Sequence, residues 1–276
     1  MAGLILLAAA SLLLAPAAQK KLIIEHPAIH QFDDGPDLDP DFQFASGETV
    51  FFDFTIPNYR REEDKVSLTW NARAQDVSGT AVILPLFGKV TTELALEDKE
   101  WLPKVRFEIP IPPHALSGTY KILISVTDDF AKTNASRDFT FQVRGHPIEP
   151  SELLEIRNIG FYRSEEAPKP LPVPAYAPGD KVWIRFDITG FKLAEQNRYE
   201  AGYGIAVLRP SGESLFAQPE AATERGETFY PRRYIPAGLS LILQKDLRPG
   251  QYTLVVTARD GVAGKKTESR HTFSVE

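Results

Sequence analysis

Apolar and polar residues alternate with a period of two through long stretches of the chain, which predicts β-strands with one buried face. Between residues 50 and 56, for example, Val50, Phe52, Phe54 and Ile56 fall on one side of such a strand. The same alternation recurs in residues 120–126, 182–188 and 252–258. Turn-forming Gly, Pro, Asn and Asp residues separate the runs, and almost no segment has a helical period. The pattern therefore predicts an all-β fold of antiparallel sandwiches.

An internal repeat organises these strands. Residues 44–56 align with residues 176–188 at an offset of 132 (176 against 44). Three later anchors keep this offset: Gly118-Thr-Tyr120 with Gly250-Gln-Tyr252, Asp128 with Asp260, and Phe141-Gln-Val143 with Phe273-Ser-Val275. Each copy is long enough to bury a core of its own. The repeat therefore predicts two tandem copies of one β-sandwich, and Trp70 and Trp183, which fall in strand patterns, are expected in their cores.

A proline-stiffened stretch lies where the first copy ends. Its sequence is Gly145-His-Pro-Ile-Glu-Pro150, and proline both fixes its own backbone and favours an extended preceding residue. We expect a first sandwich over residues 22–145, a linker over 146–151 and a second sandwich over 152–276. A linker this short leaves the two sandwiches little freedom to swing.

The segments Leu116-Ser-Gly-Thr-Tyr120 and Leu247 to Tyr252 resemble the tyrosine corner of immunoglobulin-like and fibronectin type III domains. Together with the Asp after the strand and the closing Phe-x-Val, they are also similar to macroglobulin-type and other bacterial immunoglobulin-like modules. The resemblance implies immunoglobulin-like sandwiches in which the tyrosine hydroxyl bonds back to the backbone. It also implies a non-catalytic binding, spacing or presentation role. The cystine that joins the two sheets of antibody domains is absent, because the chain has no cysteine.

The first residues predict export. An apolar run extends from Leu4 to Leu14, and Ala15-Pro-Ala17 fits a signal-peptidase site, so residues 1–17 are predicted to be a signal peptide. No Lys or Arg precedes the run, which leaves retention as an anchor as an alternative. The run is too short to span a bilayer. Export combined with the absence of cysteine indicates a periplasmic or secreted protein of bacterial type.

Composition and motifs narrow the function classes. The net charge of −6 over 276 residues argues against a nucleic-acid partner, which requires clustered basic residues. The sequence lacks a Gly-x-Ser-x-Gly elbow, a His-Glu-x-x-His motif, a P-loop and a dinucleotide fingerprint. Asp128 and Asp260 recur after equivalent strands, where Asp commonly forms local turn hydrogen bonds. We therefore predict that the protein is not an enzyme and carries no organic cofactor.

An acidic loop is the candidate metal site. It places five carboxylates within nine residues: Asp33, Asp34, Asp37, Asp39 and Asp41. Carboxylate oxygens are the ligands that calcium prefers, although the spacing differs from the EF-hand loop. The alternative is a solvated, turn-rich loop, since Asp, Gly and Pro alone account for turns.

An aromatic and basic segment is the candidate partner-binding site. Its members are Phe229, Tyr230, Arg232, Arg233 and Tyr234, and its counterpart in the first copy begins at Trp101. Aromatic and Arg side chains dominate the binding energy of protein interfaces. The alternative is a structural one, in which the rings cover a core and the bases face water.

These observations lead to a ranked set of functions. The first is an exported, non-catalytic binding, adaptor or presentation protein with a protein partner in the cell envelope. The alternative is a carbohydrate-binding accessory protein that takes up a polysaccharide. A hydrolase with dispersed carboxylates ranks below both, because small sandwiches offer little room for a deep pocket.

Overall fold

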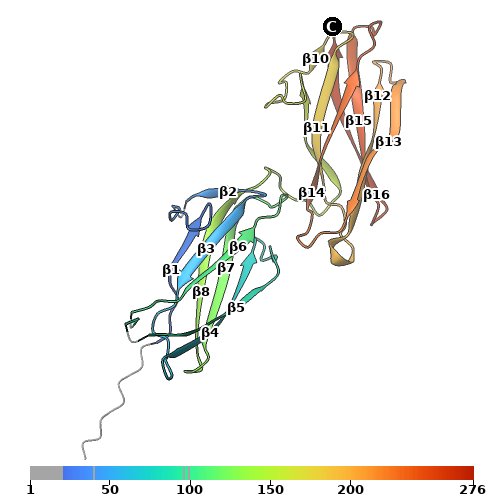
Figure 1. The fold of residues 1–276 in the computed structure, drawn as a ribbon. Coiled ribbons are helices and arrows are strands. Elements are labelled where there is room, and N and C mark those ends of the chain that lie inside the picture. The colour runs from blue at the N-terminus through green and yellow to red at the C-terminus, as the bar shows by residue number, and fades with distance from the viewer. Residues whose placement is uncertain (1–20, 40, 96, 99) are drawn as a thin grey trace, which may run out of the picture.

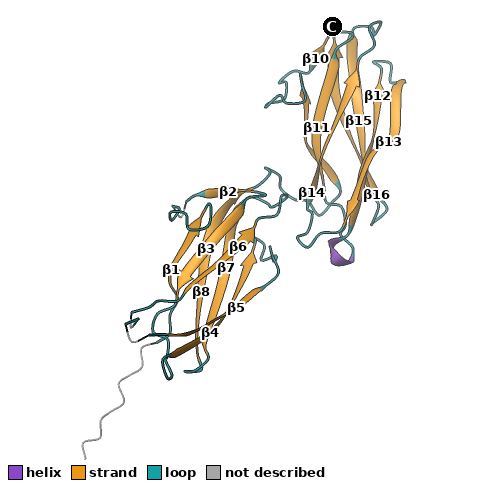
Figure 2. Cartoon of the chain, viewed as in Figure 1, coloured by secondary structure: helices purple, strands orange, loops and turns teal. Residues whose placement is uncertain are grey.

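A computed structural model describes residues 21–39, 41–95, 97–98 and 100–276 (Figure 1). The predicted signal peptide, residues 1–17, lies outside the described residues. Among the described residues, no helix is both long and apolar enough to cross a membrane. Strands dominate, and the short 3-10 helix η1 (Glu195–Asn197) is the only helical element of the described chain (Figure 2).

The N-terminal sandwich consists of a three-stranded and a five-stranded sheet. The first has the order β1 (Glu25–His30), β3 (Thr49–Thr55), β6 (Lys104–Pro110). The second has the order β2 (Gln43–Ala45), β8 (Thr133–Arg144), β7 (Gly118–Asp128), β4 (Lys65–Gln75), β5 (Leu86–Glu93). All neighbours are antiparallel except β2 and β8, which run parallel.

The C-terminal sandwich repeats this arrangement strand for strand. Its three-stranded sheet has the order β14 (Tyr234–Ile242), β11 (Lys181–Thr189), β9 (Glu155–Tyr162). Its five-stranded sheet has the order β10 (Ala175–Tyr176), β16 (Lys265–Val275), β15 (Gly250–Asp260), β12 (Tyr199–Leu208), β13 (Ser214–Gly226). The predicted all-β fold of two sandwiches is confirmed. The boundary at 146–151 stays a prediction, although β8 ends at Arg144 and β9 begins at Glu155.

The repeated anchors perform the same local tasks in both copies. Gly47 and Gly179 open equivalent turns with φ of +90° and +94°, a conformation that glycine adopts without strain. The Tyr120 hydroxyl donates to the Leu116 carbonyl at 2.9 Å, and the Tyr252 hydroxyl donates to the Arg248 carbonyl at 2.8 Å. These are the hydrogen bonds that the resemblance implied.

Asp128 and Asp260 are turn formers, as predicted. Oδ1 of each accepts two backbone N–H groups of the turn that follows, at 2.9–3.0 Å. Oδ2 of each reaches across to a third N–H, that of Arg60 in the first copy and that of Lys192 in the second. Both carboxylates are buried and their acceptor positions are occupied by backbone donors, so they hold loops in place.

Two apolar cores form between the sheets, one in each sandwich. Trp70 packs against the first core, stacked on Phe107 with ring centroids 5.6 Å apart. Trp183 was expected in the second core, and this prediction was wrong. Val182 and Ile184 point inward, so Trp183 lies between them on the outer face of β11, where the Lys181 ammonium sits 4.0 Å from the ring.

Candidate functional site

The acidic loop folds back over the outer face of β1, β3 and β6. Arg106 on β6 forms a bidentate ion pair with Asp34, with one N–O distance of 2.8 Å, and lies 3.9 Å from Asp33. Asp37 faces the ring of His30 at 3.7 Å. Asp39 accepts the backbone N–H of Asp41 at 2.9 Å. Asp33 and Asp34 therefore share Arg106, whereas Asp37 and Asp39 point to other partners.

A metal site is not visible in this arrangement. Within the described part of the chain, no three carboxylate or histidine side chains form a group that could hold a metal ion. The reason is local, since Arg106 neutralises two of the carboxylates and a third completes a turn. Calcium binding at Asp33, Asp34, Asp37, Asp39 and Asp41 stays a prediction.

The aromatic and basic segment, residues 229–234, lies at the junction between the two sandwiches. It joins β13 to β14, the edge strands of the two sheets of the C-terminal sandwich, at the end that faces the N-terminal sandwich (Figure 1). Tyr230 leaves its own sandwich and joins the core of the other one. The segment thus caps a core, as one of the two interpretations expected, but the core belongs to the neighbouring copy.

Asp76, at the end of β4, is the residue of the N-terminal sandwich that receives this segment. Its side chain is fully buried. Oδ2 accepts the Tyr230 hydroxyl at 2.8 Å and Nη2 of Arg233 at 3.1 Å. Arg233 extends to two hydroxyls of the same turn, Ser78 at 3.0 Å and Thr80 at 2.8 Å. Two side chains from one sandwich therefore hold a single loop of the other.

The turn that carries Asp76 is held by the same carboxylate. Oδ1 accepts the backbone N–H groups of Ser78 and Thr80, both at 2.8 Å. The carboxylate consequently has four donors, two from its own turn and two from across the junction. A buried charge is stable only when it is paired and hydrogen-bonded in this way. Burial, followed by hydrogen bonds with Tyr120 and Asp76, raises the pKa of Tyr230, so its hydroxyl remains a donor.

Tyr234, at the start of β14, is the second point of contact. It is buried between two histidines. The ring of His146, from the predicted linker, stacks on it with centroids 4.9 Å apart, and His114 meets it edge-on at 5.6 Å. His146 Nε2 is also 2.7 Å from Asp187, which accepts the side-chain amide of Asn158 at 2.7 Å. The linker is therefore packed against the C-terminal sandwich.

An apolar groove, here called the junction groove, opens beside these contacts. Its volume is about 260 Å³. The N-terminal sandwich contributes Val82, Pro112, Pro113 and His114, and the segment contributes Phe229, Tyr230 and Arg232. Phe229 is 51% exposed, whereas Tyr230 beside it is buried. The groove exists only where the two sandwiches meet, because both supply its walls.

Arg232 is fixed at the side of the groove. Its guanidinium lies 2.7 Å from Glu224, 5.6 Å from the centre of the Tyr199 ring, and donates through Nε to the Tyr234 carbonyl at 3.2 Å. Trp101 is elsewhere. Trp101 precedes the start of β6, whereas Pro112 and His114 follow the end of that strand. The Trp101 carbonyl accepts the Tyr59 hydroxyl at 2.8 Å. The structure therefore does not bring Trp101 together with residues 229–234.

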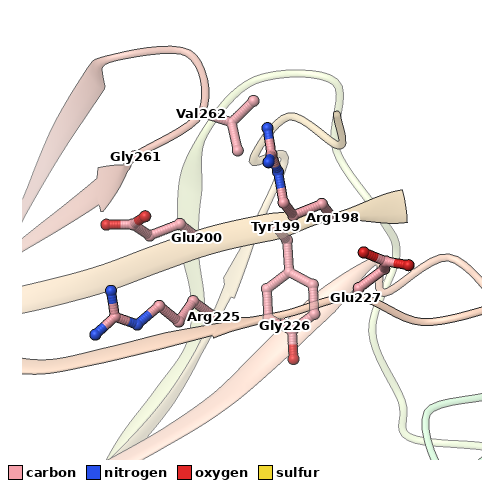
Figure 3. Close-up of a pocket in the computed structure, with 8 residues that line it drawn as sticks. All are labelled: Arg198, Tyr199, Glu200, Arg225, Gly226, Glu227, Gly261 and Val262. Atoms are coloured by element: carbon pink, nitrogen blue, oxygen red, sulfur yellow. The ribbon is translucent and has the colours of Figure 1, made fainter. Parts of the chain in front are cut away.

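A wider hollow lies near the same end of the C-terminal sandwich (Figure 3). Its volume is about 560 Å³, and four exposed charged residues line it: Arg198, Glu200, Arg225 and Glu227. Glu200 stands opposite Arg225 in the β12–β13 register. The charges alternate in sign along the paired strands, which is the arrangement of a solvated sheet face. No predicted site residue lies in it.

Comparison with known proteins gives no family. No family model and no curated protein matches the chain. Solved structures are similar over most of its length. The C-terminal domain of the Streptococcus pyogenes antigen I/II-family protein AspA is 9% identical, covers 94% of this chain and 99% of its own, and has a TM-score of 0.33. The Streptococcus agalactiae AgI/II polypeptide BspA C-terminal domain is 9% identical, covers 93% of this chain and 100% of its own, and has a TM-score of 0.32. A likeness of this degree carries no argument about function.

Three residues of the junction had no functional prediction from sequence: Asp76, His114 and His146. A sequence signal existed for the first, because Asp-x-Ser-Gly-Thr is the composition of an Asp-stabilised turn. It predicts the turn but not the donors that reach it from the other copy. The two histidines are single residues beside prolines and carry no pattern of their own.

Proposed function

We propose that this chain is an exported, non-catalytic binding protein of the cell envelope whose protein partner docks at the junction groove. One observation carries the proposal. The segment 229–234 fastens one sandwich to the other through Tyr230 and Arg233, and leaves Phe229 exposed in a groove that both sandwiches line.

The composition of the groove favours a protein partner. Phe229 and two prolines offer apolar surface, and Arg232 offers a guanidinium whose position Glu224 already fixes. Aromatic and Arg side chains held in place before binding lose little conformational entropy on association. An extended or helical segment with one apolar anchor and a nearby carboxylate would match both features.

Polysaccharide binding is the alternative, and the exposed aromatic side chains distinguish it from protein binding. Among the described residues, the exposed aromatic side chains are phenylalanines, namely Phe32, Phe87, Phe216 and Phe229. These rings lack the hydroxyl or indole N–H that a Tyr or Trp would bring to a sugar. The protein partner is therefore the proposal that the groove supports better.

Site-specific photo-crosslinking tests the proposal. A benzoyl-phenylalanine at position 229, in cells that export the chain, should give one protein adduct. The matched control is the same group at Phe216, which is also exposed but lies at a different surface, beside Leu215 and Ile242. The adduct at 229 should weaken in Asp76→Ala, which opens the groove. Identical adducts at both positions, or none at 229 together with retention of the protein on a polysaccharide gel, would contradict the proposal.

A further inference from the structure

The free edges of the four sheets differ in how they are protected against pairing with another strand. Natural proteins guard exposed edges with prolines, bulges and charges. The register of β1 shifts between Glu25 and Ala28, and that of β9 shifts opposite residues 185–187. Pro236 lies within β14, where it removes one backbone donor, and Pro219 coincides with a register shift in β13. On β6, Lys104, Arg106 and Glu108 alternate along the outer face.

The edge strand β5 has neither a proline nor a register shift, and its charges are few. All its 8 residues pair with β4 in one uninterrupted register, from Glu93 opposite Lys65 to Leu86 opposite Ala72. It contains no proline and one residue of each charge, Lys89 and Glu93. Phe87 is 72% exposed on it. A regular edge without net charge and with an exposed aromatic ring is the kind that accepts another strand.

The inner face of β5 packs closely on its neighbour β4. Leu86, Gly88, Val90 and Thr92 are partly covered, and they alternate with exposed residues. A Cβ at Gly88 would lie 2.4 Å from the Trp70 ring, so glycine leaves the room that the indole occupies. A cross-strand aromatic ring over an edge glycine restores the packing that glycine lacks. The strand is thus built to be regular up to its free edge.

The outer face of β5 has a sequence that is complementary to itself. It presents Phe87, Lys89, Thr91 and Glu93, all exposed. Two such strands can pair in antiparallel fashion about a two-fold axis that passes between the two Thr91 residues. In this register the numbers of two residues that face each other add up to 182. Lys89 then faces Glu93 of the second copy, twice, and Thr91 faces Thr91. Opposite charges and Thr pairs placed directly across a ladder stabilise it.

We infer that β5 pairs with β5 of a second copy of this chain, joining two five-stranded sheets into one continuous ten-stranded sheet (5 from each copy). The contact is isologous, so it closes as a two-fold dimer and leaves no further β5 edge free. Asp129 lies 3.3 Å from Lys89 on its own sheet. The second copy adds Glu93 on the free side, so each lysine has a carboxylate on both sides.

Charge reversal tests the register. In Lys89→Glu and in Glu93→Lys, like charges face each other across the ladder, and each full-length variant should dimerise at least about tenfold more weakly than the wild type. An equimolar mixture of the two variants restores both opposite-charge pairs and should form heterodimers with about wild-type affinity. Analytical ultracentrifugation over a range of concentrations measures all three samples. Equal weakening in the mixture would overturn the register.

Cysteine crosslinking tests the contact itself, because the chain has no cysteine to interfere. Thr91→Cys should form an interchain disulfide under mild oxidation, since residues directly opposite in a ladder lie within reach of a disulfide. Ser211→Cys, in the exposed turn between β12 and β13, is the control and should form no interchain disulfide. A wild type that is monomeric at all concentrations, or a dimer whose Thr91→Cys form does not crosslink, would overturn the proposal. Capture of a strand from a different protein at Thr91→Cys would also overturn it.

Discussion

At the scale of single residues, the junction depends on Asp76. Its carboxylate is fully buried and has four donors, of which Tyr230 and Arg233 come from the other sandwich. Breaking a buried pair by removing one partner leaves a charge or a polar atom unsatisfied, and this costs more than the pair contributes when intact. Asp76 therefore links the folding of its own turn to the packing of the C-terminal sandwich against the N-terminal one.

Removal of one hydroxyl tests this coupling. Tyr230→Phe takes one donor from Asp76 and should lower the free energy of unfolding by about 1–3 kcal/mol, the usual cost of an unsatisfied buried polar group. Urea unfolding followed by circular dichroism measures the change. Tyr234→Phe is the matched control, because no hydrogen bond of its hydroxyl is found in the described part of the chain, and it should cost less than half as much. Equal costs would contradict the role given to Asp76.

Local and distant residue roles differ in how far sequence predicts them. Some side chains bond to backbone groups within four residues, namely Tyr120, Tyr252 and, through Oδ1, Asp128 and Asp260. Their roles can be predicted from the neighbouring sequence. The partner of Tyr230 lies 154 residues away. Neither the segment 229–234 nor the turn of Asp76 has a sequence pattern that indicates the other. The aromatic and basic segment could therefore be predicted from sequence, but its partner could not.

At the scale of elements, period-two alternation predicted the strands and their inner faces. It did not predict what would cover the outer faces. On β3 the acidic loop covers the outer face through Arg106 of the neighbouring β6, and on β11 the Arg185 guanidinium sits 3.6 Å from the Tyr162 ring. The residues that cover the outer faces differ between the two copies, so the repeat does not predict them. The same limit applies to the acidic loop, because its sequence does not indicate that Arg106 pairs with Asp33 and Asp34.

His114, in the connection between β6 and β7, should make the stability of the protein fall in mild acid. Burial, followed by the nearby Arg232 guanidinium, lowers the pKa of His114 from 6.5. A histidine whose pKa is lower in the folded state than in the unfolded state leaves stability unchanged above about 6.5. As the pH falls below that value, the unfolded chain takes up the proton first, and stability is lost until the pH passes the folded pKa.

His114→Phe should remove this part of the pH dependence. The variant keeps a ring against Tyr234 and cannot take up a proton. Between pH 7 and pH 5, its free energy of unfolding should fall less steeply than that of the wild type, by at most about 1.4 kcal/mol for each pH unit. His271, whose pKa burial also lowers, contributes equally to both proteins. Parallel curves for the two proteins would show that His114 carries no such coupling.

At the scale of the whole molecule, the protein is two copies of one sandwich that are fastened together. The sequence predicted the duplication and the all-β fold, because each of these leaves a periodic signal. The short, stiff linker stays a prediction. The fastening itself comes from Tyr230, Arg233 and Tyr234, which differ from the corresponding residues of the first copy. A groove shared by two copies of one fold therefore arises where the copies have diverged.

The most direct test of the fastened junction is a distance measurement between the sandwiches. Spin labels at Lys121→Cys, on β7, and Lys192→Cys, after β11, occupy exposed sites in the two sandwiches of a chain without other cysteines. Pulsed electron paramagnetic resonance should give one narrow distance distribution. In Asp76→Ala, which removes the acceptor of Tyr230 and Arg233, the distribution should broaden. A broad distribution in the wild type, unchanged in Asp76→Ala, would contradict the account.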